Sequence, residues 1–231
     1  MSFGPTPTSA PTEPLLKGRE IVVGVCGSIA CYKVADVVSK LVQLGAGVTV
    51  VMTPAAAKFV GPLTFQALTN RPVRVDQFDL SHPDDTQHIS LTEKADLMLV
   101  APATNTTIAK IAHGICDDIV SLLVCASACP VVLAPAMNSR MWEDPIAQEN
   151  FAKLASVGYR FIGPEAGFLA CRNIGVGRLS EPATIVAEVV KMLTQPGMMP
   201  APVTTRVDDG ADDDAMDEDV ADGESLDAEA K

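Results

Sequence analysis

The chain alternates short apolar runs with segments of helical periodicity, and this alternation most constrains its fold. The runs have the length and β-branched content of buried strands, whereas the segments between them repeat apolar residues every three or four positions. Strands that are apolar throughout and separated by helices predict a parallel sheet covered on both faces. The expected strands are 20–25, 48–52, 96–100, 130–133 and 159–162. The expected helices are 29–44, 62–69, 106–113, 117–128, 145–156 and 182–193.

Composition divides the chain into three parts. Residues 1–16 are rich in Pro, Thr and Ser and are expected to form a flexible leader, and residues 17–195 form the expected folded domain. Residues 208–229 hold twelve of the 29 acidic residues, so most of the net charge of −12 lies in the segment 196–231. That segment lacks an apolar period, which predicts a disordered acidic tail. The tail favours solubility or, alternatively, binds a basic partner.

The sequence excludes several classes of protein. The body carries no basic stripe, so nucleic acid is not an expected partner. No apolar run approaches the roughly 18 residues that span a membrane, and no signal peptide is recognisable. We therefore expect a cytoplasmic protein whose six cysteines are free thiols. The spacing of Cys125 and Cys129 fits core packing on a helix, and without a second ligand pair no metal is expected.

Small and hydroxyl-bearing residues follow three successive predicted strands. Gly27 and Ser28 come after the first strand and precede a helix, whose N-terminus suits an anion. The second strand ends at Thr53 rather than at an acid, and the Gly-x-Gly-x-x-Gly pattern of dinucleotide sites is absent. Residues 104–107 read Thr-Asn-Thr-Thr at another helix start. One such loop can be a structural cap, but three at one sheet edge predict a cleft for a mononucleotide cofactor.

The segment 134–142 follows the strand 130–133 and carries unusual chemistry. Met137 and Met141 suit the face of a flat apolar ligand. Asn138 can hold a carboxylate without bringing a charge of its own. Trp142 is the single Trp of the chain. The alternative is that the Met and Trp side chains only pack in the core.

Two further residues are candidates for catalysis. His88 can act as a base or charge partner near neutral pH, although a lone His is more often a surface or core residue. Cys171 lies in a segment that Gly175 and Gly177 predict to be a flexible loop. Arg172 and Arg178 would raise the thiolate fraction of Cys171.

These segments resemble the flavin-containing cysteine decarboxylases. Residues 135–142 match the family signature Pro-x-Met-Asn-x-x-Met-Trp, and residues 170–178 resemble its substrate clamp. Residues 27–30, 88–89 and 101–104 match the family in the same order. The resemblance runs from about residue 17 to 193. It is strongest to the phosphopantothenoylcysteine decarboxylases, particularly the decarboxylase half of the bacterial bifunctional coenzyme A enzyme. The segment after residue 193 is too short for that enzyme's ligase domain, so ligase activity is not implied.

The resemblance implies an α/β, Rossmann-like (flavodoxin-like) three-layer fold with a parallel sheet. It also implies FMN-dependent decarboxylation of 4′-phosphopantothenoyl-L-cysteine to 4′-phosphopantetheine in coenzyme A biosynthesis, by a trimer or a dodecamer of trimers. The implied cofactor contacts are Gly27, Ser28, Ile29, Thr53, Thr104, Asn105, Thr106, Thr107, Ala136 and Met137. The implied substrate contacts are Asn138, Met141, Gly175, Gly177 and Arg178.

The resemblance also assigns catalytic roles. The flavin oxidises the substrate thiol with help from His88, and the resulting thioaldehyde loses carbon dioxide while Asn138 holds the departing carboxylate. Cys171 then protonates the aminoenethiol as the flavin returns its electrons. Many family members read Ala-Asn-Thr where residues 105–107 read Asn-Thr-Thr, so the contact of the middle Asn is not carried over to Thr106.

Two alternatives share the fold. One is a peptidyl-cysteine decarboxylase, whose clamp usually differs from the form seen in this chain. The other is a phosphatase-regulating binding protein with an acidic C-terminal tail. The presence of His88, Asn138 and Cys171 favours catalysis over pure binding.

Overall fold

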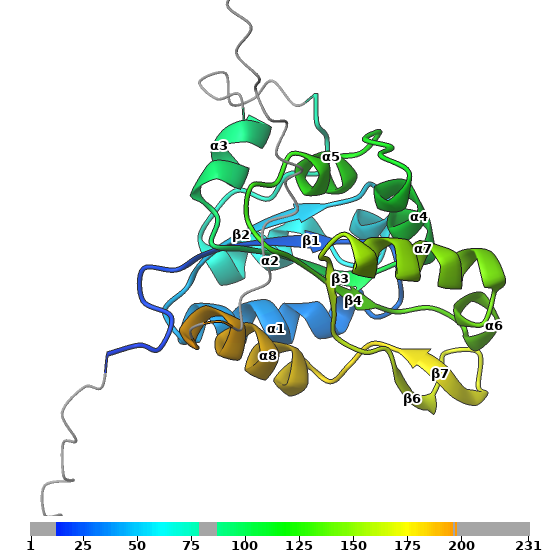
Figure 1. Ribbon diagram of the computed structural model, residues 1–231. Coiled ribbons are helices and arrows are strands. Elements are labelled where there is room, and N and C mark those ends of the chain that lie inside the picture. Colours follow the sequence, from blue (N-terminus) through cyan, green and yellow to red (C-terminus); the bar gives the residue numbers. More distant parts are fainter. Residues whose placement is uncertain (1–12, 79–86, 196, 198–231) are drawn as a thin grey trace, which may run out of the picture.

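The central element of the fold is a five-stranded parallel sheet (Figure 1). A computed structural model describes residues 13–78, 87–195 and 197. The strand order is β2-β1-β3-β4-β5, which is the flavodoxin-like order. The strands are β1 (Glu20–Val25), β2 (Gly47–Met52), β3 (Leu97–Ala103), β4 (Val131–Pro135) and β5 (Arg160–Phe161). The expected α/β fold with a parallel sheet is confirmed.

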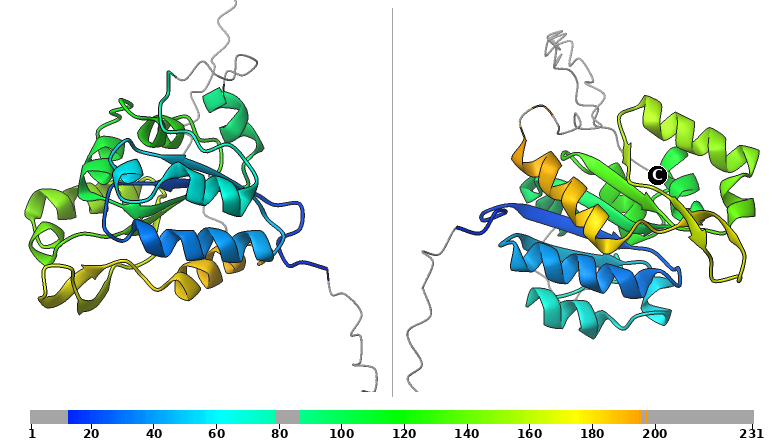
Figure 2. Two further views of the ribbon diagram at one scale, coloured as in Figure 1. Left: turned by 180° about the vertical axis from the view of Figure 1, so that it is seen from behind. Right: turned by 90° about the horizontal axis from the view of Figure 1, so that it is seen from below.

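Helices cover both faces of the sheet and complete the three layers (Figures 1 and 2). One face carries α1 (Cys31–Gln43), α2 (Pro62–Thr69) and α8 (Pro182–Thr194). The other carries α3 (Gln87–Lys94), α4 (Asn105–Ala112), α5 (Ile119–Cys125) and α7 (Pro145–Ser156). A 3-10 turn, η1 (Ala56–Lys58), and the short α6 (Ser139–Trp142) lie in connections.

Successive side chains along the strands point to opposite faces of the sheet and pack in two separate hydrophobic cores. In β1, Val23 packs in the cluster that includes Val38 of α1 and Val189 of α8. Its neighbour Val22 packs in the other cluster, with Leu123 of α5. Because both faces of every central strand are buried, the strands are apolar throughout rather than alternating.

The Gly-rich segment around Cys171 is not the flexible loop that we expected. It forms an antiparallel hairpin of β6 (Glu165–Phe168) and β7 (Ile174–Arg178), with Cys171 in the turn. The glycines serve close packing instead. A Cβ at Gly177, where φ is +137°, would overlap the carbonyl oxygen of Met137, and one at Gly175 would overlap Ser139 Oγ. The absence of these side chains lets β7 lie directly against the loop that follows β4.

Several boundaries also differ from the expected ones. The helix expected at 117–128 is shorter, because Asp118 caps it through the backbone N–H groups of Val120 and Ser121, and α5 ends at Cys125. The helices α3 and α6 were not expected. Leu16, assigned to the leader, is fully buried, and its N–H donates to the Leu44 carbonyl at 2.8 Å. The folded body therefore extends beyond residue 17 toward the N-terminus.

The flexible leader and the disordered acidic tail were expected at residues 1–16 and 196–231. Residues 1–12 and most of 196–231 lie outside the described residues. All six cysteines are free thiols. Within the described part of the chain, no group of three or more His, Cys, Asp or Glu residues could hold a metal ion. No described helix is long and apolar enough to cross a bilayer.

The packing of β1 beneath α5 generates a prediction. A Cβ at Gly24 would lie 2.9 Å from Val120 Cγ1, closer than two carbons tolerate. Gly24→Ala should therefore lower the free energy of unfolding by about 1–3 kcal/mol through overpacking. In a urea titration, adding Val120→Ala to this variant should restore part of the loss, although Val120→Ala alone destabilises. Strictly additive losses in the double variant would contradict this contact.

Candidate functional site

The site lies where the sheet changes its winding direction. The connection that leaves β1 enters α1 on one face, whereas the connection that leaves its neighbour β3 enters α4 on the other. The diverging connections open a crevice at the carboxyl ends of the strands, which is where ligands bind in such sheets. Gly27 and Ser28 follow β1, and residues 104–107 follow β3. The fold thus brings together loops that are nearly 80 positions apart in the sequence.

A cavity of about 570 Å³, which we call the crevice cavity, occupies this position. Nine of the ten residues that the resemblance assigns to the cofactor line it, and Met141 joins them. These nine are Gly27, Ser28, Thr53, Thr104, Asn105, Thr106, Thr107, Ala136 and Met137. The tenth, Ile29, lines the neighbouring cavity described below.

The first wall of the crevice cavity is the contact between the loops after β1 and β2. A Cβ at Gly27 would lie 2.5 Å from the Cβ of Ala55, so only glycine lets these loops meet. Ser28 Oγ accepts a hydrogen bond from the Ala30 N–H at 3.3 Å, and Thr53 Oγ1 accepts one from the Ala56 N–H at 3.2 Å. Each hydroxyl keeps its own O–H donor, so the pair can bind an anion without a cationic side chain.

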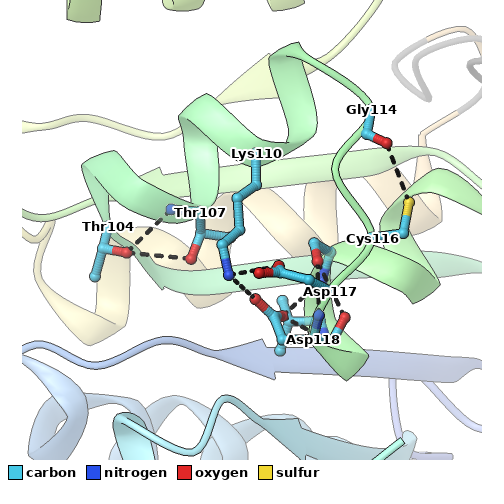
Figure 3. Close-up of polar contacts among 9 residues, drawn as sticks. Thr104, Thr107, Lys110, Gly114, Cys116, Asp117 and Asp118 are labelled. Atoms are coloured by element: carbon cyan, nitrogen blue, oxygen red, sulfur yellow. Dashed lines mark hydrogen bonds and ion pairs between the residues drawn. The ribbon is translucent and has the colours of Figure 1, made fainter.

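The second wall is the start of α4 (Figure 3). Thr104 caps the helix, because its Oγ1 accepts from the Thr107 N–H at 3.3 Å and lies 3.1 Å from the Thr107 hydroxyl. Asn105 Oδ1 is buried and has no hydrogen-bond partner among the described residues. A buried acceptor without a donor is costly, so this atom suits a ligand that carries an N–H group.

Three charged residues that the sequence analysis missed also line the crevice cavity. Lys110 Nζ lies 2.6 Å from Asp117 Oδ1 and 2.7 Å from Asp118 Oδ2 (Figure 3). Burial acts to lower the pKa of Lys110, but its hydrogen bonds to the two carboxylates raise the pKa overall. The hydrogen bond from Lys110 lowers the pKa of Asp117. The positive charge of Lys110 is therefore neutralised by the two carboxylates beside it. In the sequence, the one sign of this charged group was the acidic pair Asp117 and Asp118 directly before α5.

A second cavity, of about 630 Å³, lies between the start of α1 and the hairpin, and we call it the hairpin cavity. Ile29, Lys33, Phe168 and Arg178 line it, as do Met137, Asn138 and Cys171. Its cations are paired with acids. Lys33 Nζ lies 3.2 Å from Glu181, and Arg178 bonds Glu165 at 3.1 Å and Glu181 at 3.2 Å. Lys33 was missed, although it stands in the helix directly after the Gly-Ser turn.

Two of the three candidate catalytic residues meet at the hairpin. Asn138 Nδ2 donates to Cys171 Sγ at 3.2 Å, and Asn138 Oδ1 accepts from the Arg140 N–H at 2.9 Å. The backbone locks this arrangement, because the Met137 N–H donates to the Gly177 carbonyl at 2.8 Å. The carboxamide is thereby held in one orientation beside an exposed thiol.

The third candidate, His88, remains a prediction. It is the second residue of α3, and its side chain lies outside the described residues. Leu91 and Lys94 of the same helix line a cavity with Glu20, at the amino ends of the strands. The second half of α3 is therefore at the opposite edge of the sheet from the crevice.

Comparison with known proteins assigns the chain to a family. The model of the family described as Flavoprotein matches residues 9–194. The chain belongs to the flavoprotein family. This flavoprotein is 46% identical over 172 residues to the coenzyme A biosynthesis bifunctional protein CoaBC of Bacillus subtilis, a match that covers 74% of the chain and 42% of that protein. It thus spans less than half of the bifunctional relative.

A shorter relative is matched over nearly its whole length. The flavoprotein is 42% identical over 177 residues to a probable phosphopantothenoylcysteine decarboxylase of Streptococcus mutans, covering 76% of the chain and 99% of the relative.

Solved structures agree with this assignment. A mutant phosphopantothenoylcysteine decarboxylase complexed with pantothenoylaminoethenethiol superposes with a TM-score of 0.66 at 27% identity, covering 74% of the flavoprotein and 96% of that chain. The FMN-dependent cysteine decarboxylase SpaF superposes with a TM-score of 0.62 at 30% identity, covering 76% and 98%. Family and neighbours indicate a flavin cofactor. The hydroxyl pair Ser28 and Thr53, the Met137 side chain and the unpartnered Asn105 Oδ1 all fit such a group.

The environments of the cysteines in the flavoprotein generate a prediction. Burial raises the pKa of the Cys26 thiol to about 12, and burial is also the main cause that raises the pKa of Cys125 to about 12. Cys171 is exposed in the hairpin turn. Because the thiolate is the nucleophile, iodoacetamide at pH 8 should alkylate Cys171 before Cys26 and Cys125. Peptide mass spectrometry measures the order. Labelling of native Cys26 as fast as Cys171 would contradict the structure.

Proposed function

We propose that this flavoprotein is an FMN-dependent carboxy-lyase that decarboxylates 4′-phosphopantothenoyl-L-cysteine to 4′-phosphopantetheine, a step of coenzyme A biosynthesis. The observation that carries the proposal is the Asn138–Cys171 pair, whose Nδ2 and Sγ atoms are 3.2 Å apart beside the crevice cavity. A carboxylate-binding amide next to a thiol proton donor is what this reaction needs. A relative named as a probable phosphopantothenoylcysteine decarboxylase and one named for coenzyme A biosynthesis support it.

The cofactor that suits the crevice cavity is FMN. Ser28 and Thr53 offer one group of hydroxyl donors for a single phosphate. The sequence contains no second nucleotide fingerprint, which argues against FAD. Met137 offers a polarizable apolar surface to a flat ring, and Asn105 offers its carboxamide. When bound, the flavin supplies reversible two-electron chemistry that no side chain can supply.

The residues of the chain then have distinct tasks. The Asn138 carboxamide, fixed by the Arg140 N–H, donates a hydrogen bond to the substrate carboxylate before that group leaves as carbon dioxide. Cys171 holds a proton on Sγ beside the same position and transfers it to carbon after decarboxylation. Phe168 and Leu169 of the hairpin add apolar side chains to the lining of its cavity.

The complete site is proposed to form between copies of the chain. In such an assembly a neighbouring subunit is proposed to supply His88. We infer a homotrimer or a dodecamer of trimers, as the family resemblance implies. The acidic segment after residue 195 is proposed to promote solubility or to bind a basic partner.

The proposal is tested by incubating the purified full chain, loaded with FMN, with phosphopantothenoylcysteine and analysing products by mass spectrometry. We expect loss of carbon dioxide and formation of phosphopantetheine. A parallel reaction with a peptide that ends in cysteine tests the alternative substrate class. No product from phosphopantothenoylcysteine, or faster reaction of the peptide, would contradict the proposal.

The role of Cys171 gives a sharper prediction. Cys171→Ser should still release carbon dioxide but accumulate a product two hydrogens lighter than phosphopantetheine, because the protonation of carbon is lost. A mutant of a related decarboxylase was crystallised with pantothenoylaminoethenethiol, a compound of this oxidised type. Cys125→Ser is the matched control, since Cys125 lies in α5 and lines neither the crevice cavity nor the hairpin cavity. Normal product at the normal rate from Cys171→Ser would remove Cys171 from the mechanism.

A further inference from the structure

A third cavity adjoins the Asn138–Cys171 pair. It measures about 570 Å³, and we call it the clamp cavity. It is lined by Asn138, Ser139, Arg140, Cys171, Asn173 and Ile174. Two of these residues also line the hairpin cavity, so a ligand held by the pair can extend into the clamp cavity. Its volume is within the range of about 300–1,000 Å³ that is usual for small-molecule sites.

The charge of the clamp cavity differs from that of its neighbours. In the crevice cavity Lys110 is paired with Asp117 and Asp118. In the hairpin cavity the cations Lys33 and Arg178 are likewise paired with carboxylates. The residues that line the clamp cavity include no acid.

Arg140 brings the positive charge to the clamp cavity. Its guanidinium forms no ion pair with any residue that the structure describes. Among the described residues that line the three cavities, Arg140 is thus the one cation that has no acidic partner and can pair with a ligand.

The neutral groups of the clamp cavity are also suited to an anion. Ser139 Oγ is buried and has no hydrogen-bond partner among the described residues. Asn173 contributes a carboxamide from the hairpin turn. A guanidinium, a hydroxyl and an amide together present several donors, and guanidinium groups match the geometry of phosphate oxygens.

We propose that the clamp cavity is the subsite for the phosphate of a phosphorylated substrate, and that Arg140 is the residue that selects for it. This inference rests on the proposed function and deepens it, because it names the group that separates the substrate from an unphosphorylated or peptidyl cysteine. Asn138 binds the carboxylate at one end of the substrate and Arg140 binds the phosphate at the other.

The test compares Arg140→Gln with Arg160→Gln in the FMN-loaded full chain. Arg160 is an exposed arginine of β5 that lines none of the three cavities, so it controls for the loss of a surface charge. Each variant is assayed with phosphopantothenoylcysteine and with pantothenoylcysteine. Arg140→Gln should raise KM for the phosphorylated substrate about 10- to 100-fold, the range expected for one lost hydrogen-bonded charge contact. KM for the unphosphorylated substrate and the flavin content should stay unchanged.

A binding measurement separates this inference from the proposed function. Calorimetric titration with phosphopantetheine and with pantetheine requires no turnover, and Arg140→Gln should abolish the preference for the phosphorylated compound. An unchanged preference in Arg140→Gln, or equal losses with both compounds, would overturn the assignment of Arg140. Failure of the unmodified protein to decarboxylate either substrate, with a phosphate preference still present and dependent on Arg140, would overturn the proposed reaction and leave the subsite in place.

Discussion

The hydrogen bond from the Met137 N–H to the Gly177 carbonyl is the interaction on which the site depends. It joins the loop after β4 to the last strand of the hairpin at 2.8 Å. It can form because Gly177 has no side chain to overlap the Met137 carbonyl and tolerates a φ of +137°. The docked hairpin then places Cys171 against Asn138. Asn138 and Cys171 are 33 positions apart in the sequence, and this backbone contact helps to bring them together.

Ion pairs around the hairpin organise the charge of the site. Glu181, which precedes α8, binds both Lys33 of α1 and Arg178 of β7, and Arg178 also binds Glu165 of β6. These side chains are partly exposed, so each pair contributes little to stability by itself. They neutralise Lys33 and Arg178. Among the described cations that line the hairpin and clamp cavities, Arg140 is thus the one without an ion pair.

Much of the fold was predictable because its determinants are local. Strand 20–25 and helices 62–69 and 145–156 have the expected bounds, since a buried strand is an apolar run and proline marks both helix starts. The hairpin was not predictable. Gly175 and Gly177 are explained by contacts with residues 137–139, which are distant in sequence. Phe168 and Ile174 of the hairpin are exposed rather than part of an apolar pattern. The pairing of Lys110 with Asp117 and Asp118 likewise depends on the path of the loop between α4 and α5.

The most direct test of the central claim is a crystal structure of the full chain grown with FMN. The claim is that the flavin occupies the crevice between the loops after β1 and β3, beside the Asn138–Cys171 pair. The expected result is a phosphate bonded to the hydroxyls of Ser28 and Thr53 and a ring in contact with Met137. A flavin bound elsewhere on the protein, with the crevice filled only by water, would contradict the claim.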